Sequence, residues 1–269
     1  MVSSFLDLIR IGPCLQIGLF TGLCLAFWGR APALSFFSLL PALALACLAA
    51  GGYALNDRYD VKTDRINAPA RPLPSGRLSQ RFALRAGFGL LAAGLALCAA
   101  INAAAFSVGL LDAALIIFYA RNSKRLGWLK TITVCWLHAS IFVFVAAVLM
   151  RIDAVLELTA LYVFLSTAFR ETVKDERDAR GDRAGGAGTP PTLKVDRRRR
   201  LLAAHLALAG SALLPIPLYL SGRGNVWLPI FVSCAAGWYY AASKFEVKKA
   251  EWMNLGVILE LLAFLRGLT

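Results

Sequence analysis

The chain has 269 residues, of which 58% are hydrophobic and 17% are charged, and its mean hydropathy is +0.63. A soluble domain contains about 45–50% apolar and about 25% charged residues, so this composition excludes an ordinary soluble enzyme and a disordered chain. The formal net charge is +13, which is typical either of nucleic-acid binding or of the basic cytoplasmic loops of a membrane protein. The positions of the charges decide between these two classes.

A membrane-spanning helix needs about 20 mostly apolar residues. The sequence contains about nine such segments and lacks the period-2 alternation that is typical of strands. This pattern predicts an all-α membrane protein with about nine transmembrane helices around a central cavity. The predicted spans are residues 11–28, 33–54, 82–101, 103–120, 131–150, 154–170, 201–220, 226–243 and 252–268. The tight gaps after residues 101 and 150 predict helical hairpins, and Pro215 and Pro217 predict a kink.

Nearly all basic residues fall on one side of such a bundle. All of the 29 Lys and Arg residues except Arg30, Arg151, Arg223 and Arg266 lie near the N-terminus or in loops that nine spans place on the same face. Because basic loops stay in the cytoplasm, we expect the N-terminus and the charged loops there and the C-terminus outside. The chain is therefore predicted to be a single integral domain, residues 1–269, of the inner (cytoplasmic) membrane, with no nucleic-acid partner.

Two of the predicted cytoplasmic loops carry the same acidic pattern, D-x-x-D-x-x-x-D followed by Arg. The acidic residues are Asp57, Asp60 and Asp64 in the first loop and Asp175, Asp178 and Asp182 in the second. In a helical conformation these positions share one stripe, where three like charges repel unless a cation compensates them. Solvated loops with ordinary salt bridges are the alternative. Two clusters with matched spacing favour Mg²⁺, which binds carboxylate oxygens and joins them to substrate phosphates.

Basic, hydroxyl and aromatic side chains accompany both acidic clusters. The candidates for substrate binding are Arg71, Arg77, Tyr119, Arg121, Ser123, Lys124 and Lys174. Arginine presents a fork of donors that suits phosphate, and the Pro and Gly residues after each cluster predict turns rather than helix. Acidic metal sites beside basic residues at a membrane surface indicate a diphosphate ligand whose apolar tail lies between the helices.

The motifs themselves resemble those of a known family. The stretch N-D-x-x-D-x-x-x-D, from Asn56 to Asp64, resembles the first signature of the UbiA superfamily of intramembrane prenyltransferases. The stretch from Asp175 to Asp182 resembles the second signature. The wording D-R-I-N-A-P-A-R-P-L-P-S-G-R, which begins at Asp64, is most similar to the digeranylgeranylglyceryl phosphate synthase branch of this superfamily.

The resemblance implies Mg²⁺-dependent transfer of a prenyl group from an allylic prenyl diphosphate to a lipophilic acceptor in the membrane. The metal set that it implies is Asn56, Asp57, Asp60, Asp64, Asp175, Asp178 and Asp182. The catalytic set that it implies is Asp60, Asp64, Asp178, Asp182, Tyr119 and Lys124. In this scheme the ring face of Tyr119 stabilises the allylic cation that forms when the diphosphate leaves.

The acceptor depends on the branch. The branch resemblance implies geranylgeranyl transfer to geranylgeranylglyceryl phosphate, with Arg77, Arg121 and Arg125 available for the acceptor phosphate. One departure concerns the first span, where Pro13 and Cys14 occupy a neighbourhood in which many members carry an Asn. Prenylation of an aromatic acceptor of a quinone or chlorophyll-type pathway is therefore an alternative. A non-enzymatic transporter is a more remote one, since transporters place ionisable groups near the membrane midplane.

Overall fold

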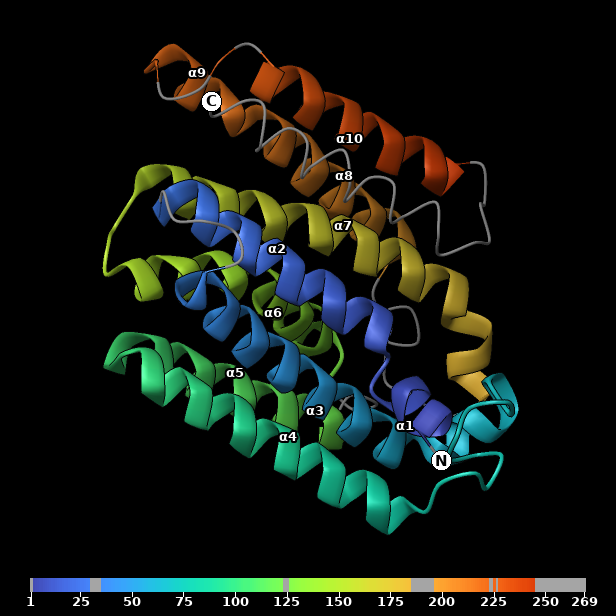
Figure 1. The fold of residues 1–269 in the computed structure, drawn as a ribbon. Helices are drawn as coiled ribbons and strands as arrows, with labels where there is room; N and C mark the ends of the chain where they lie inside the picture. The colour runs from blue at the N-terminus through green and yellow to red at the C-terminus, as the bar shows by residue number, and fades with distance from the viewer. Residues whose placement is uncertain are drawn as a thin grey trace. The chain divides into compact units, whose positions relative to one another are not determined.

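The computed structural model describes residues 2–29, 35–122, 126–184, 196–222, 225 and 227–244, without the side chains of residues 67, 177–184, 227, 231 and 242–244. These residues form ten α-helices and no strand, which confirms the predicted all-α class for the described part of the chain (Figure 1). The helices are α1 (Val2–Leu8), α2 (Ile11–Gly29), α3 (Phe36–Asn67), α4 (Gln80–Ile101), α5 (Ala103–Asn122), α6 (Trp128–Leu149), α7 (Ala154–Ala184), α8 (Arg197–Leu213), α9 (Pro215–Leu220) and α10 (Trp227–Lys244).

Within the described ranges, six helical segments are long and apolar enough to cross a membrane. They are α2, α3, α4, α5, α6 and the segment Arg197–Leu220, which joins α8 and α9. Only 22% to 44% of the residues in their apolar windows are buried inside the protein, so most of this apolar surface is left for lipid tails. The chain is thus a multi-pass membrane protein. The predicted spans 154–170 and 226–243 fall on α7 and α10, and 252–268 lies outside the described residues, so the count of nine stays a prediction.

The expectation that the acidic clusters lie in loops is wrong. Helix α3 continues past the predicted span end at residue 54 as far as Asn67, and α7 continues past residue 170 as far as Ala184. No Pro or Gly interrupts α3 between Tyr53 and Ala68, and Pro69 then follows the helix end. Both acidic patterns therefore lie on helical extensions, and in α3 the helix sets the spacing of the Asp57, Asp60 and Asp64 side chains.

Contacts between residues divide the chain into two compact units, which are described separately below. The first contains α1 to α5 and residues Ser140–Ile152, and the second contains residues Gly127–Ala139, Asp153–Asp182 and α8 to α10. The predicted single domain, residues 1–269, remains a proposal.

In the first unit, α3 and α4 approach closely at glycines. A Cβ added to Gly51 of α3 would lie 2.8 Å from the Gly87 carbonyl oxygen, and one added to Gly94 would lie 3.0 Å from the Ala44 carbonyl oxygen. Small residues let membrane helices come close enough for backbone packing, which compensates for the absence of a hydrophobic driving force in lipid. Helix α3, which carries the first acidic stripe, is thereby held firmly against its neighbour.

A single residue, Asn102, makes the turn between α4 and α5. Its Oδ1 accepts a 2.7 Å hydrogen bond from the Ala105 backbone N–H, as an N-cap does, and its Nδ2 donates a 3.1 Å bond to the Ala147 carbonyl oxygen of α6. The predicted hairpin after residue 101 is confirmed. The capping side chain also ties this hairpin to α6.

The second unit has an apolar core between α7, α8 and α10. Its buried members are Phe169, Val173, Ala204, Leu208, Ala236 and Tyr239. The predicted kink is present as a break at Leu214, where α8 ends and α9 begins at Pro215. This core includes Phe169 and Val173 of α7, which precede Asp175, the first residue of the second acidic stripe.

Candidate functional site

The first acidic stripe lies on the last turns of α3 and is held by two arginines. Nη2 of Arg10 donates a 2.9 Å hydrogen bond to Oδ1 of Asp57, whose side chain is only 3% exposed. Nη1 of Arg71 donates a 2.8 Å hydrogen bond to Oδ2 of Asp64 and lies 3.5 Å from Oδ1 of Asp57. One guanidinium therefore contacts both carboxylates, which confirms that Asp57 and Asp64 share a helix face.

Arg10 was not among the residues predicted for the site. It lies between α1 and α2 with a φ of 50°, and its guanidinium carbon is 4.8 Å from the centroid of the Tyr53 ring. This left-handed backbone conformation turns the chain so that the side chain reaches α3. The available sequence signal was a charged residue directly before a long apolar segment, because such a charge needs a partner when it is partly buried.

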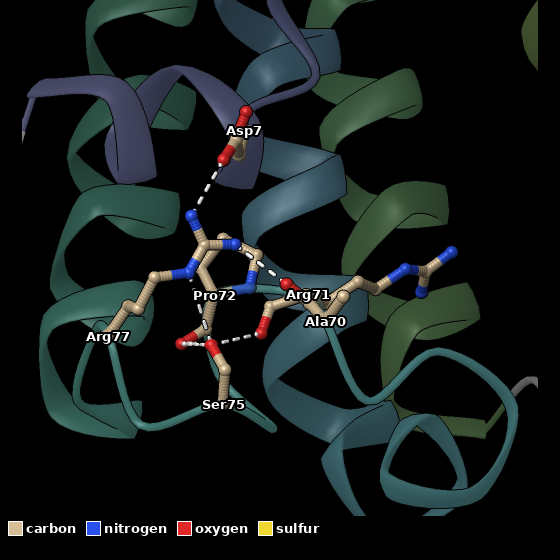
Figure 2. Close-up of polar contacts among 6 residues, drawn as sticks. All are labelled: Asp7, Ala70, Arg71, Pro72, Ser75 and Arg77. Atoms are coloured by element: carbon tan, nitrogen blue, oxygen red, sulfur yellow. Dashed lines mark hydrogen bonds and ion pairs between the residues drawn. The ribbon is translucent and has the colours of Figure 1, made fainter.

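The loop after α3 is tied together by Arg77. Its Nη1 donates a 3.1 Å hydrogen bond to Oδ2 of Asp7, its Nη2 donates a 2.7 Å bond to the Ala70 carbonyl oxygen, and its Nε donates a 3.2 Å bond to Oγ of Ser75 (Figure 2). Figure 2 shows the side chain of Arg71 extending away from Arg77. Thus Arg77 organises the loop, whereas Arg71 points out of it toward the acidic stripe.

Apolar side chains anchor the same loop. Leu73 and Leu78 are buried in one cluster with Leu8 of α1 and Val61 of α3. The Oγ of Ser75 donates a 2.7 Å hydrogen bond to the Arg71 carbonyl oxygen, which fixes the backbone from which the Arg71 side chain starts. The sequence P-x-R-P-L-P-S-G-R, residues 69–77, thus forms a compact turn that directs the Arg71 guanidinium toward α3.

One oxygen next to this stripe has no hydrogen-bond partner among the described atoms. Oδ1 of Asn56 is buried and unpaired. A buried polar atom left unsatisfied costs about 1–3 kcal/mol, so this oxygen is available to a partner such as a water, an ion or a ligand. Asp60, one turn beyond Asn56, is half-buried and makes a further polar interaction. The donor set at this end of α3 is therefore all oxygen, as Mg²⁺ prefers.

The second acidic stripe lies on α7 in the other unit. Nζ of Lys130, in the first turn of α6, donates a 2.6 Å hydrogen bond to Oδ1 of Asp175, and the two side chains are 13% and 2% exposed. Oδ2 of Asp175 is buried and has no partner among the described atoms. Burial raises the pKa of Asp175, although the Lys130 ammonium opposes the rise. Asp178 and Asp182 follow on α7, and their side chains lie outside the described residues.

Neighbouring charges fix α7 to α8. Nε and Nη2 of Arg200 donate hydrogen bonds of 3.0 Å and 2.6 Å to Oε1 of Glu176, and Nε of Arg197 donates a 3.2 Å bond to Oε2. Nζ of Lys174 lies 3.4 Å from Oε2 of Glu171 and its side chain is largely exposed. Of these residues, only Lys174 was predicted for the site. The run of arginines at residues 197–200 therefore has a structural partner in Glu176.

The third predicted segment follows α5. Tyr119 is half-buried in the last turn of this helix, and Nε of Arg121 donates a 3.2 Å hydrogen bond to Oη of Tyr59 on α3. Ser123, Lys124 and Arg125 lie outside the described residues. The structure therefore brings Arg121 to the helix that carries the first acidic stripe.

The placed side chains do not by themselves complete a metal centre. Among the described residues, no group of three or more His, Cys, Asp or Glu side chains is arranged to hold a metal ion. Because the carboxylates of Asp178 and Asp182 are outside that set, the predicted ligand list remains a prediction. The unpaired oxygens of Asn56 and Asp175 are the observations in this structure that fit a cation.

Acidic and basic residues paired at the end of an apolar membrane helix, as on α3, are typical of a functional site in a membrane protein. The chain belongs to the UbiA prenyltransferase family, since the model of this family matches residues 17–251. It is accordingly a prenyltransferase.

Curated relatives agree along nearly the whole chain. The chain is 31% identical to the digeranylgeranylglyceryl phosphate synthase of Methanosarcina barkeri, over 99% of this chain and 98% of that protein. It is 33% identical to the protein of the same name from Methanopyrus kandleri, over 86% of this chain and 87% of that protein.

Solved structures share the fold. A structure concerning digeranylgeranylglyceryl phosphate synthase in membranes has a TM-score of 0.79 and 24% identity, and covers 98% of this chain and 96% of that chain. A UbiA homologue from Archaeoglobus fulgidus bound to GPP and Mg²⁺ has a TM-score of 0.73 and 19% identity, and covers 97% and 96% of the two chains. At these identities the likeness establishes the fold.

Proposed function

We propose that this protein transfers a geranylgeranyl group from geranylgeranyl diphosphate to geranylgeranylglyceryl phosphate, forming an ether lipid in an Mg²⁺-dependent reaction. The observation that carries this proposal is the similarity over almost the full length to relatives named digeranylgeranylglyceryl phosphate synthase. The A. fulgidus homologue bound to GPP and Mg²⁺ supports the donor class and the metal. The paired acidic and basic residues on α3 and α7 supply matching chemistry.

In this proposal, oxygen atoms at the end of α3 in the first unit and oxygen atoms at the end of α7 in the second unit are each ligands of Mg²⁺. The candidate ligands are Asn56, Asp60, Asp64, Asp175, Asp178 and Asp182, with Asp57 in support. The unpaired oxygens of Asn56 and Asp175 support the assignment. When bound, Mg²⁺ would neutralise the diphosphate and make it a better leaving group. Asp57 serves mainly to orient Arg10 and Arg71, because both guanidinium groups already contact its Oδ1.

Basic residues bind the diphosphate oxygens alongside the metal. Arg71 contacts the two carboxylates of α3 through one nitrogen, Nη1, and its side chain is 37% exposed, so the rest of its fork can face a ligand. Lys174 of α7 and Lys124, which follows α5 in the sequence, are the further residues proposed to bind the diphosphate. The candidates for binding the acceptor phosphate are Arg121, Arg125 and Arg77. The engagement of Arg77 inside the loop makes it the weakest of these candidates.

The proposed chemical step is an alkyl transfer through an allylic cation. The C–O bond to the diphosphate breaks, and its electron pair leaves with the diphosphate oxygen as an allylic cation develops. The ring of Tyr119 stabilises this cation, and the apolar helices exclude water from it. The hydroxyl oxygen of the acceptor then attacks the carbon that carried the diphosphate, and its proton passes to the released diphosphate, which completes the ether.

The remaining proposals concern topology. We place the protein in the inner membrane with about nine spans, as one domain, with both acidic stripes and the N-terminus facing the cytoplasm and the C-terminus outside. The concentration of Lys and Arg in the loops on one side supports this orientation.

The test is a product assay. Purified full-length protein in lipid nanodiscs is incubated with Mg²⁺ and geranylgeranyl diphosphate, together with geranylgeranylglyceryl phosphate or an aromatic acid, and the lipids are analysed by mass spectrometry. The proposal expects an Mg²⁺-dependent ether lipid from the first acceptor. Product from the aromatic acid alone would overturn the acceptor assignment. Absence of product with either acceptor would overturn the proposed function.

A further inference from the structure

Lys130 is the only Lys, Arg, Asp or Glu in the 22 residues of α6. Its ammonium is largely buried and lies 2.6 Å from Oδ1 of Asp175, a residue 45 positions further along the chain. A buried charge without a partner is strongly unfavourable, so this pair accounts for a lysine at the start of an otherwise uncharged helix. Lys130 is assigned no role by the motifs that define the acidic stripes.

The pair leaves half of the Asp175 carboxylate unused. Oδ2 of Asp175 is buried and has no partner among the described atoms, while Oδ1 is held by Lys130. A fully structural ion pair usually has its remaining lone pairs satisfied as well. The arrangement is therefore that of a carboxylate whose orientation is fixed on one side and whose other oxygen is kept for a ligand.

We propose that Lys130 is a positioning residue that acts as an internal counter-cation for Asp175, and that a divalent cation competes with it electrostatically for this carboxylate. The inference rests on the proposed function, in which Asp175 contributes to the Mg²⁺ site. Lys130 neutralises the stripe on α7 when no metal is bound, and it keeps Asp175 in the orientation that the metal uses. Its positive charge weakens metal binding, which allows the ion to leave together with diphosphate.

If Lys130 competes with the cation, its removal raises the affinity for a divalent cation, whereas a purely structural role predicts no increase. Removing the ammonium in Lys130→Met frees Oδ1 of Asp175 from its counter-cation, so the full charge of this carboxylate is available to a divalent cation and the affinity rises. We expect Mn²⁺ to bind about tenfold more tightly, which corresponds to about 1.4 kcal/mol. Lys130→Arg keeps the charge and the pairing, and we expect it to bind Mn²⁺ within about twofold of the unaltered protein.

The experiment is a titration of the full-length protein with Mn²⁺ alone, followed by electron paramagnetic resonance in the absence of any prenyl diphosphate. Arg81→Met is the matched control, because it removes one exposed positive charge from the first turn of α4. We expect the control to leave the Mn²⁺ affinity unchanged. Unchanged or weaker Mn²⁺ binding in Lys130→Met would overturn the proposal.

A double variant is measured as well, so that the result does not depend on correct folding of Lys130→Met alone. Lys130→Met combined with Asp175→Asn removes both charges, and in the Asp175→Asn background we expect the loss of Lys130 to change Mn²⁺ affinity less than twofold. A tenfold effect in that background would overturn the assignment to Asp175. Failure of the unaltered protein to form the ether lipid would overturn the proposed function, whereas the Mn²⁺ titration reports on Lys130 without any product.

Discussion

Arg71 and Asp64 lie seven positions apart, and Nη1 of Arg71 donates a 2.8 Å hydrogen bond to Oδ2 of Asp64. The chain therefore folds back after α3 and places a guanidinium on the acidic stripe that the helix has just presented. The same nitrogen lies 3.5 Å from Oδ1 of Asp57, so one cation serves two carboxylates. The acidic charge of the proposed metal and diphosphate site is thus partly balanced by its own loop.

The first prediction concerns Arg71. Arg71→Met removes a donor that pairs with the α3 stripe and that we propose to bind the diphosphate, so we expect kcat/KM for geranylgeranyl diphosphate to fall about 100-fold, as measured by steady-state kinetics. Arg71→Lys keeps the charge but not the fork, and we expect a smaller loss of about tenfold. Arg85→Met, on the exposed face of α4, is the control for net charge. Equal losses in Arg85→Met and Arg71→Met would contradict a specific role.

The second prediction tests the carboxylates proposed to hold Mg²⁺. Asp60→Asn and Asp182→Asn should each lower the rate of ether formation at least about 100-fold, because an amide does not supply the negative charge that holds the cation. Asp196→Asn is the control, since it also removes one negative charge but retains an acceptor for the Arg198 N–H at the start of α8. Full activity of Asp60→Asn at ordinary Mg²⁺ concentrations would remove Asp60 from the metal set.

The third prediction separates loop structure from substrate binding at Arg77. The Arg77–Asp7 pair is exposed, with side chains 42% and 50% accessible, so the ion pair itself contributes about 0.2–1 kcal/mol. Adding the lost bond to the Ala70 carbonyl, we expect Arg77→Met to lower the free energy of unfolding by about 1–2 kcal/mol. Asp7→Asn should cost less than about 1 kcal/mol. A raised KM for the acceptor with unchanged stability would instead support a phosphate-binding role for Arg77.

The fourth prediction concerns the hairpin at Asn102. Asn102→Ala removes the cap on the Ala105 N–H and the donor to the Ala147 carbonyl, so we expect a loss of about 1–3 kcal/mol in the free energy of unfolding. Asn102→Asp keeps the capping acceptor but not the donor, and it should be intermediate. Denaturation followed by circular dichroism measures both. Asn102 follows the C-terminal end of α4, whereas the acidic stripe of α3 precedes the loop that leads to the N-terminal end of α4. We therefore expect the catalytic constants of the folded fraction to change less than twofold.

The acidic stripes illustrate where prediction from sequence succeeded and where it failed. The spacing of Asp57 and Asp64 predicted a shared face, and the contact of both residues with Arg71 confirms it. The same stretch was expected to be a loop because its residues are charged, yet α3 continues through it to Asn67. Hydropathy indicates where the apolar span ends, but a helix ends only where its backbone hydrogen bonding stops. In α3, Arg10 and Arg71 from other segments pair with the carboxylates and so stabilise the charged helical extension.

The sequence by itself determined the all-α membrane class, the two acidic stripes and the basic residues that accompany them, because hydropathy, spacing and side-chain chemistry are local properties. Only the tertiary structure decided which cation meets which carboxylate. Arg10 pairs with Asp57 across 47 positions and Lys130 with Asp175 across 45. Such pairs depend on how helices pack and on the backbone turn at Arg10, and no periodicity within one segment encodes them.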